Sequence, residues 1–116
     1  MRPRSAVVGL WQALEAGEWT RMEAQFAPDA RVRDAARGEE LGAAEWVARQ
    51  RVEGAAAVTL RRVVTQSNDV AAEIAVTRHG AQRSVAAFYL LRDGRIAAAV
   101  EYWAPQPPEP APPAGG

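Results

Sequence analysis

Residues 70–103 have the sequence VAAEIAVTRHGAQRSVAAFYLLRDGRIAAAVEYW, in which apolar and other side chains alternate through three runs. Gly80 separates the first run from the second, and Asp93-Gly94 separates the second from the third. Alternation with a period of two is typical of strands with one buried face, and Asp-Gly between such runs is a strong hairpin signal. The stretch therefore predicts three antiparallel strands joined by tight turns. They span residues 70–78, 83–91 and 95–103.

The chain before this stretch changes from a helical to an extended pattern. Residues 58–66 add a fourth strand to the meander, closed by a turn at residues 67–69. Earlier, Val7, Leu10, Trp11 and Leu14 fall on one face of a helix. We expect helices at residues 5–16, 18–26 and 43–52, a short strand at 30–34 and a loop at 38–42. Three helices before a four-stranded meander predict an α+β fold with the helices on one face of the sheet.

The composition restricts the chemistry that the chain can perform. It has 116 residues, with 14 basic and 14 acidic side chains, and 48% of its residues are hydrophobic. Every basic residue is Arg, Cys is absent, and His79 is the single histidine. A Schiff-base lysine, a thiolate nucleophile and a metal site of several histidines or cysteines are therefore excluded. We expect no cofactor and no metal.

Charge and hydropathy also bound the partners and the location. The balanced charge predicts no nucleic-acid partner, and no apolar run approaches the ~20 residues of a membrane span. The N-terminus lacks the apolar stretch of a signal peptide, so we expect a cytoplasmic protein. Residues 105–116 contain six of the eight prolines. We expect one domain at residues 1–104 and a Pro-rich, disordered tail at residues 105–116.

The order of elements is similar to that of a known family. The motifs that carry the likeness are LEAGEW at 14–19, FAPDA at 26–30, Gly42 before the third helix, DGRI at 93–96 and EYW at 101–103. Over about residues 5–104 the chain resembles SnoaL-like polyketide cyclases, ketosteroid isomerases and nuclear transport factor 2. The resemblance implies a cone-shaped, curved antiparallel sheet wrapped around N-terminal helices, the cystatin-like α+β roll, with an apolar pocket inside.

Asp34, at the end of the first predicted strand, is the first catalytic candidate. The resemblance places it where ketosteroid isomerases hold the aspartate that moves a proton next to a carbonyl. The alternative is an aspartate that caps the strand end or faces water. By the same resemblance, Leu10 and Ala87 stand where those isomerases have a tyrosine and a second acid. Neither can donate a hydrogen bond, so steroid isomerisation by that mechanism is not expected.

Glu101 and Tyr89 are the other two catalytic candidates. Strand alternation puts Ala99, Glu101 and Trp103 on one face of the last strand, and Ile96 on the opposite face. The resemblance implies that the face with Trp103 lines the cone, so Glu101 points into it. The alternatives for Glu101 are an ion pair with an arginine near the mouth, or exposure at the strand end. The Tyr89 hydroxyl can bind a ligand or a backbone group.

These candidates lead to one leading hypothesis and one alternative. The leading function is binding of a small apolar or polycyclic molecule in the cone, with cofactor-independent isomerase or cyclase chemistry by Asp34. A cavity open to solvent and faced by Asp34 would favour it. The alternative is a non-catalytic ligand-binding or dimerisation module of the same fold. The residues expected to contact the ligand are Trp11, Leu14, Trp46, Ile74, Val76, Val85, Ala87, Ala99 and Trp103.

Two further expectations concern the surface. Arg78 and His79 stand at a predicted hairpin end, where a surface role is expected rather than catalysis. The outer face of the meander is more apolar than a solvated sheet face should be, which predicts a homodimer. Its side chains are Ala71, Ala75, Ala86, Phe88, Ala98, Val100 and Tyr102.

Overall fold

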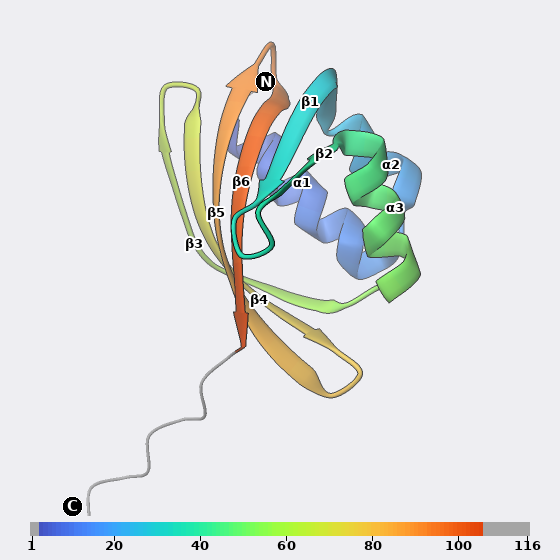
Figure 1. The fold of residues 1–116 in the computed structure, drawn as a ribbon. Coiled ribbons are helices and arrows are strands. Elements are labelled where there is room, and N and C mark those ends of the chain that lie inside the picture. The colour runs from blue at the N-terminus through green and yellow to red at the C-terminus, as the bar shows by residue number, and fades with distance from the viewer. Residues whose placement is uncertain (1–2, 106–116) are drawn as a thin grey trace, which may run out of the picture.

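The computed structural model describes residues 3–105, which form three helices and six strands (Figure 1). The helices are α1 (Pro3–Ala16), α2 (Trp19–Ala24) and α3 (Ala43–Glu53). The strands are β1 (Phe26–Asp34), β2 (Glu39–Gly42), β3 (Ala57–Gln66), β4 (Asp69–Arg78), β5 (Ala81–Arg92) and β6 (Arg95–Pro105). Residues 106–116, and with them nearly all of the expected tail, lie outside the described residues.

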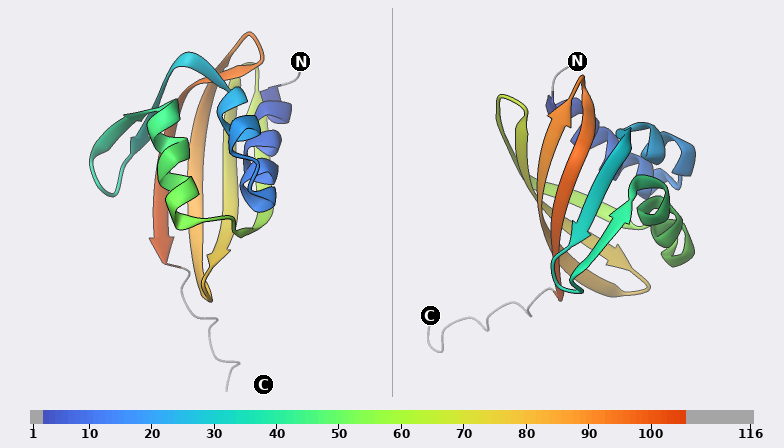
Figure 2. Two further views of the ribbon diagram at one scale, coloured as in Figure 1. Left: turned by 90° about the vertical axis from the view of Figure 1, so that its right-hand side faces the viewer. Right: turned by 45° about the horizontal axis from the view of Figure 1, so that its top comes forward.

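All six strands form one curved, unclosed sheet in the order β2-β1-β6-β5-β4-β3. The four-strand meander β3 to β6 confirms the prediction, and β1 and β2 extend it at the β6 side. Every pair is antiparallel except β1 and β6, which run parallel. Figure 2 shows that the three helices lie against one side of the sheet, on its concave face. The expected α+β cone is therefore confirmed.

The core fills the space between the helices and the concave face. Val7, Leu10, Trp11 and Leu14 of α1 are fully buried, which confirms the apolar stripe predicted for this helix. The alternating residues of β4 and β5 meet them from the sheet, because every second side chain of a strand points to the same face. These buried sheet residues are Val70, Ala72, Ile74, Val76, Val85, Ala87, Tyr89 and Leu91.

Two of the hairpin turns have the backbone geometry that their sequences predict. Asp93 and Gly94 both have positive φ, of 52° and 76°, as the two central residues of a type I′ turn require. His79 and Gly80 repeat the arrangement between β4 and β5, with φ of 51° and 78°. Tight turns at both ends of β5 hold β4, β5 and β6 in register.

Three sequence-based expectations need correction. The expected loop at 38–42 contains β2, which pairs with β1 through partners such as Val32 and Leu41. The strand expected at 30–34 begins earlier, at Phe26. Ile96 was expected on the outer face but is fully buried in the core. A β-bulge explains it: Leu91 pairs with Ile96 and Leu90 with Ala98, so β6 carries one extra residue there.

Among residues 3–105, no helix is both long enough and apolar enough to cross a membrane.

Candidate functional site

A buried glutamate, Glu101 on β6, is the most unusual side chain of the concave face. It is 1% exposed. Its Oε1 accepts a hydrogen bond from Trp46 Nε1 at 2.8 Å and a second from Trp103 Nε1 at 3.0 Å. Neither of the two expected alternatives, an ion pair or an exposed strand end, describes this carboxyl. Instead it lies inside the cone, and α3 and β6 each supply an indole donor to it.

Burial changes the acidity of this group. Desolvation disfavours the charged form and raises the pKa of Glu101 from 4.5 to about 7. The indole donors of Trp103 and Trp46 oppose that shift because they stabilise the carboxylate, while the negative charge of Asp34 adds to it. A carboxyl with a pKa near neutrality exists in both protonation states at neutral pH, as proton transfer in either direction requires.

Asp34 lies at the mouth of the cone rather than inside it. Its side chain is 19% exposed, and its Oδ1 accepts a hydrogen bond from the backbone N–H of Arg37 at 3.2 Å. Its Oδ2 lies 3.9 Å from Arg37 Nε. In the parallel β1–β6 pair, Asp34 is the direct partner of Glu101. The structure thus brings the two expected carboxylates together but gives the buried environment to Glu101.

Tyr89 occupies a different place from the other two candidates. It is 3% exposed, and its hydroxyl oxygen accepts a hydrogen bond from Trp11 Nε1 at 2.9 Å. Burial, with a further contribution from the charge of Glu101, raises the pKa of Tyr89 well above its usual value, so its hydroxyl stays protonated. Its partner is a side chain of the core rather than the expected backbone group or ligand.

Aromatic rings surround the two indoles that bind Glu101. The ring of Trp11 packs edge-on against Trp46 with centroids 6.2 Å apart, and lies 6.1 Å from the ring of Trp103. Phe26 packs against Trp46 from β1 at 5.6 Å. Edge-to-face and tilted contacts of this kind hold the indoles in place, so that their N–H groups are already oriented toward the carboxyl.

A cavity of about 330 Å³ adjoins Glu101 and reaches the surface at the free end of the β4–β5 hairpin. Val32, Leu41, Trp46, Val76 and Trp103 form its apolar walls. Asp34 and Glu101 both line it. Its volume lies at the lower end of the range typical of small-molecule sites.

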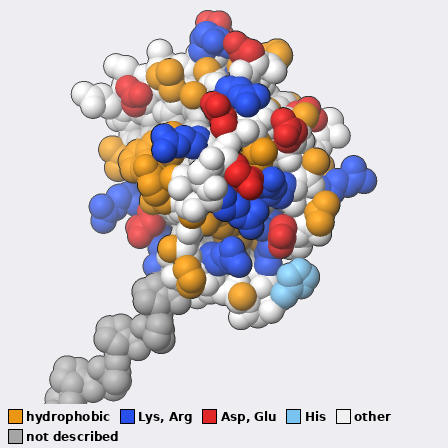
Figure 3. Space-filling view, in the orientation of Figure 1, with side chains coloured by type: hydrophobic (Ala, Val, Ile, Leu, Met, Phe, Trp, Pro, Cys, Tyr) orange, Lys and Arg blue, Asp and Glu red, His pale blue; other side chains and the backbone are white. Residues whose placement is uncertain are grey.

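The mouth of the cavity carries most of its charge. Four arginines, Arg37, Arg49, Arg78 and Arg83, line it together with His79 and Glu53. In Figure 3, basic side chains gather in the lower part of the visible face, not far from the histidine. The sequence-based interpretation treated Arg78 and His79 as surface residues. Strand alternation could have placed Arg78 correctly, because it continues the buried face of Val76 on β4.

The residues expected to contact a ligand divide into two groups. Trp46, Val76 and Trp103 line the cavity. The others are buried in the core, where α1 covers the upper part of the concave face. They are Trp11, Leu14, Ile74, Val85, Ala87 and Ala99. The large side chains of α1, such as Trp11 and Leu14, fill that half of the cone.

Within residues 3–105, no cluster of three or more His, Asp or Glu side chains is arranged to hold a metal ion.

Comparison with known proteins agrees with this fold. The family model of the SnoaL-like domain matches residues 7–99, and the chain belongs to that family. None of the curated proteins matches this chain in sequence.

Solved structures of the same fold are similar over most of their length. An NTF-2 like protein of unknown function from Burkholderia xenovorans superposes with a TM-score of 0.84 at 22% identity, covering 93% of this chain and 87% of that one. A candidate ketosteroid isomerase from Kribbella flavida gives 0.81 at 20% identity, covering 96% and 83%. IdmH from Streptomyces antibioticus, a candidate polyketide cyclase, gives 0.79 at 17%, covering 89% and 92%. At these identities the likeness establishes the fold, while function depends on the site.

Proposed function

We propose that this protein binds a small, largely apolar molecule in the cavity and that Glu101 transfers a proton to or from it. The single observation that carries the proposal is the buried Glu101 carboxyl, which lines a solvent-connected cavity and has a pKa of about 7. Asp34, the base expected from the resemblance, becomes an electrostatic partner, because its charge helps to raise the pKa of Glu101.

The walls of the site limit the ligand. Trp46, Trp103, Val76 and Leu41 offer apolar and aromatic surface, which suits a molecule of one to three rings. The neutral form of Glu101 can be buried beside an apolar ligand at a modest cost in free energy. For a permanently ionised carboxylate that cost would be much larger. The two indole donors then stabilise the carboxylate once its proton has left.

The proton transfer that this geometry supports is isomerisation or cyclisation next to a carbonyl. The Glu101 carboxylate removes a proton from the carbon beside the carbonyl, and the C–H electron pair moves into the enolate. Return of that proton to a different carbon gives the isomer. The enolate carbon can instead form a bond to an electrophilic carbon of the same molecule, which closes a ring. Glu101 then protonates the oxygen of the acceptor.

The core residues Leu10 and Ala87 bear on the type of substrate. Neither side chain can donate a hydrogen bond to an enolate oxygen. A substrate whose C–H group is already acidic, such as a 1,3-dicarbonyl compound, needs less stabilisation of that oxygen and fits the site better than a simple ketone. Because Leu10 and Ala87 supply no such donor, the second candidate function is ligand binding without chemistry.

Hydrogen–deuterium exchange distinguishes the two functions. 2-Tetralone is a bicyclic ketone whose C1–H group is acidified by both the carbonyl and the aromatic ring. When it is incubated with the protein in D2O, it should gain deuterium at C1 faster than in buffer alone, as followed by NMR. Glu101→Gln should reduce the protein-catalysed rate by about 10²-fold or more. Glu73→Gln, which alters an exposed glutamate of β4 away from the cavity, should leave it unchanged. Saturable binding with equal exchange rates in the wild type and Glu101→Gln would refute proton transfer by Glu101.

A further inference from the structure

Two arginines extend the concave face of the sheet beyond its apolar part. Arg78 follows Val76 on β4, and Arg83 precedes Val85 on β5, so both side chains continue rows that are buried further along. The register places Arg83 opposite Val76 and Arg78 opposite Ala81, which makes the two arginines diagonal neighbours. Both line the cavity.

Arg78 is half-buried, and its hydrogen-bond partners are uncharged. Its Nε donates to the carbonyl of Gly54 at 2.9 Å, and its Nη2 donates to Gln50 Oε1 at 2.7 Å. Burial lowers the pKa of Arg78; the charge of Glu53 opposes that effect, and the charge of Arg83 adds to it. The guanidinium is therefore held in place by neutral groups, beside a like charge, with further N–H groups not engaged by those two bonds.

The other two arginines of the cavity differ in this respect. Arg49 Nη1 lies 2.6 Å from Glu39 Oε2, and Arg37 forms the longer pair with Asp34. Between residues 3 and 105, neither Arg78 nor Arg83 has a carboxylate within ion-pair distance. Arg78 is partly desolvated and Arg83 is exposed beside it. A partly desolvated guanidinium next to a like charge is costly unless an anion joins the two.

We propose that Arg78 and Arg83 bind a carboxylate group of the ligand, while its apolar body extends toward Trp103, Trp46 and Glu101. This inference rests on the proposed function and names the class of molecule: an aromatic or polycyclic carboxylic acid. The guanidinium group suits a carboxylate because its planar donors match the two oxygens. His79 and Glu53 line the same cavity, and the charge of Glu53 acts on Arg78.

The length of the ligand follows from the register of β5 and β6. Glu101 pairs with Ala87, and Arg83 lies four positions before Ala87 on the same strand. At about 3.4 Å per residue this is a separation of about 14 Å along the strand. A flexible arginine side chain shortens that distance. A molecule of two or three rings can therefore place its carboxylate at the arginines and its opposite end at Glu101.

A matched pair of probes tests the inference. Biphenyl-4-carboxylate and the neutral biphenyl-4-carboxamide have nearly the same shape and differ in charge. The indole N–H signals of Trp46 and Trp103 in an NMR titration report binding in the cavity directly, and that of Trp19, outside it, is an internal control. We expect the wild type to bind the carboxylate about tenfold more tightly than the amide, which corresponds to one charge-assisted contact.

Substitution of the arginines tests whether they cause the preference for the carboxylate over the amide. Arg83→Gln should remove most of it without affecting the fold, because Arg83 is exposed. Arg95→Gln, which changes an exposed arginine at the far end of β6, should retain it. Arg78→Gln should remove the preference as well, although it also breaks the contacts to Gln50 and Gly54; Arg83→Gln keeps the test valid if that variant fails to fold.

The possible results separate the two proposals. Equal affinity for the two probes would overturn carboxylate recognition. An equal loss of the carboxylate preference in Arg83→Gln and Arg95→Gln would do the same. Either result would leave the proposed cavity function standing. If neither probe shifts the indole signals of Trp46 and Trp103, both ligand binding in the cavity and carboxylate recognition are overturned.

Discussion

Asp34 and Glu101 lie directly opposite each other on the parallel strands β1 and β6, and both carboxyl groups line one cavity. Only Glu101 is buried, and the charge of Asp34 contributes to the elevation of its pKa. We therefore predict that Asp34→Asn lowers the pKa of Glu101 and leaves the Glu101 hydrogen bonds intact. A ¹³C-detected NMR titration of the glutamate carboxyls measures this. An unchanged or higher pKa would show that the two groups do not interact.

The pKa of Glu101 also predicts how stability depends on pH. The folded pKa, about 7, exceeds the ordinary value of 4.5, so between these values the folded state holds more protons than the unfolded state. The free energy of unfolding therefore falls as the pH rises from about 4.5 to about 7, by about 3 kcal/mol in total, and levels off above that range. Denaturant unfolding at pH 5 and pH 8 measures it. Glu101→Gln should lack this decrease, and an equal decrease in both proteins would contradict the assignment.

Loss of either indole donor should change the pKa of Glu101 in the same direction, but the two losses should differ in their effect on the free energy of unfolding. Trp46→Phe and Trp103→Phe each remove one hydrogen bond to Oε1, so each should raise the pKa of Glu101 further. Trp46 is 3% exposed and packs against Phe26 and Trp11, whereas Trp103 is half-buried. Trp46→Phe should therefore cost about 1–3 kcal/mol, and Trp103→Phe less. Trp19→Phe is the control, and a fall in the pKa of Glu101 would refute the role of the donors.

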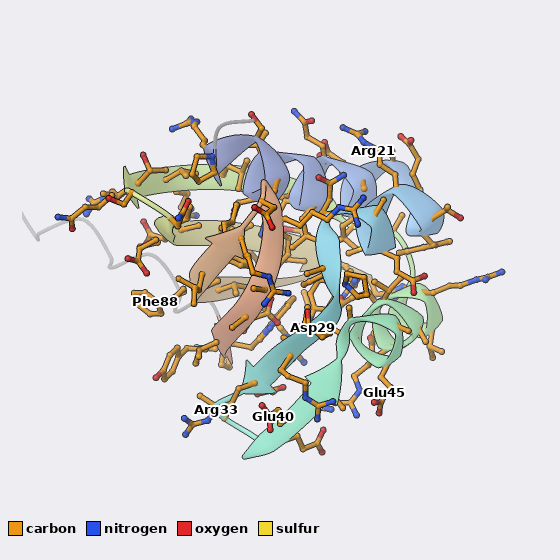
Figure 4. The ribbon with its side chains drawn as sticks, turned by 90° about the horizontal axis from the view of Figure 1, so that it is seen from above. Arg21, Asp29, Arg33, Glu40, Glu45 and Phe88 are labelled. Carbon is orange, nitrogen blue, oxygen red and sulfur yellow. The ribbon has the colours of Figure 1, made fainter. Side chains whose placement is uncertain are left out.

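The convex face of the sheet leads us to predict a homodimer. Phe88 and Tyr102 are 52% and 50% exposed, and their rings pack edge-to-face with centroids 6.1 Å apart. Figure 4 shows Phe88 pointing away from the helices, on the outer side of the sheet. Leu90 adds further exposed apolar surface on the same face. Pairing of two copies through this face would remove it from water.

Sedimentation at micromolar concentrations tests the dimer. The wild type should show a concentration-dependent mass that approaches twice that of the chain. Phe88→Glu should be monomeric with an unchanged melting temperature at low concentration. Arg51→Glu, which changes an exposed arginine of α3 on the other side of the sheet, should remain dimeric. A wild type that stays monomeric at every concentration would contradict the prediction.

Local patterns in the sequence predicted most of the fold, because few of its elements depend on distant contacts. Helix α1, the three hairpins and the alternating faces of β4 and β5 all follow from spacing and turn residues. Strand β2 could not be predicted, since it has four residues with one buried side chain, Leu41, and depends on pairing with β1. The parallel contact of β1 with β6 likewise joins segments far apart in the chain.

The candidate site was harder to predict than the fold for a physical reason. The sequence singled out Asp34 and Glu101, and the resemblance to ketosteroid isomerases put Asp34 first. Local pattern could not correct that order, because it shows neither how deep a side chain lies nor what donates a hydrogen bond to it. The pKa of Glu101 depends on burial by the core and on Trp46, which is 55 residues away in the chain. Strand alternation alone could have placed Arg78 and Arg83 on the concave face. It could not have predicted the cavity that they line, because that cavity forms only when α3 packs nearby.

The extra residue at Ala97 has a consequence for how this site can be lost or gained. Without the bulge, the face that holds Ile96 would hold Val100 and Tyr102, and Glu101 would emerge on the convex side. Loss of one alanine from residues 97–99 would make the bulge unnecessary and keep Glu101 inside, because Ile96 and Glu101 would then be an even number of positions apart. With the present spacing, the bulge itself keeps the acid inside, and a change that straightened β6 would turn its second half inside out without altering a functional residue.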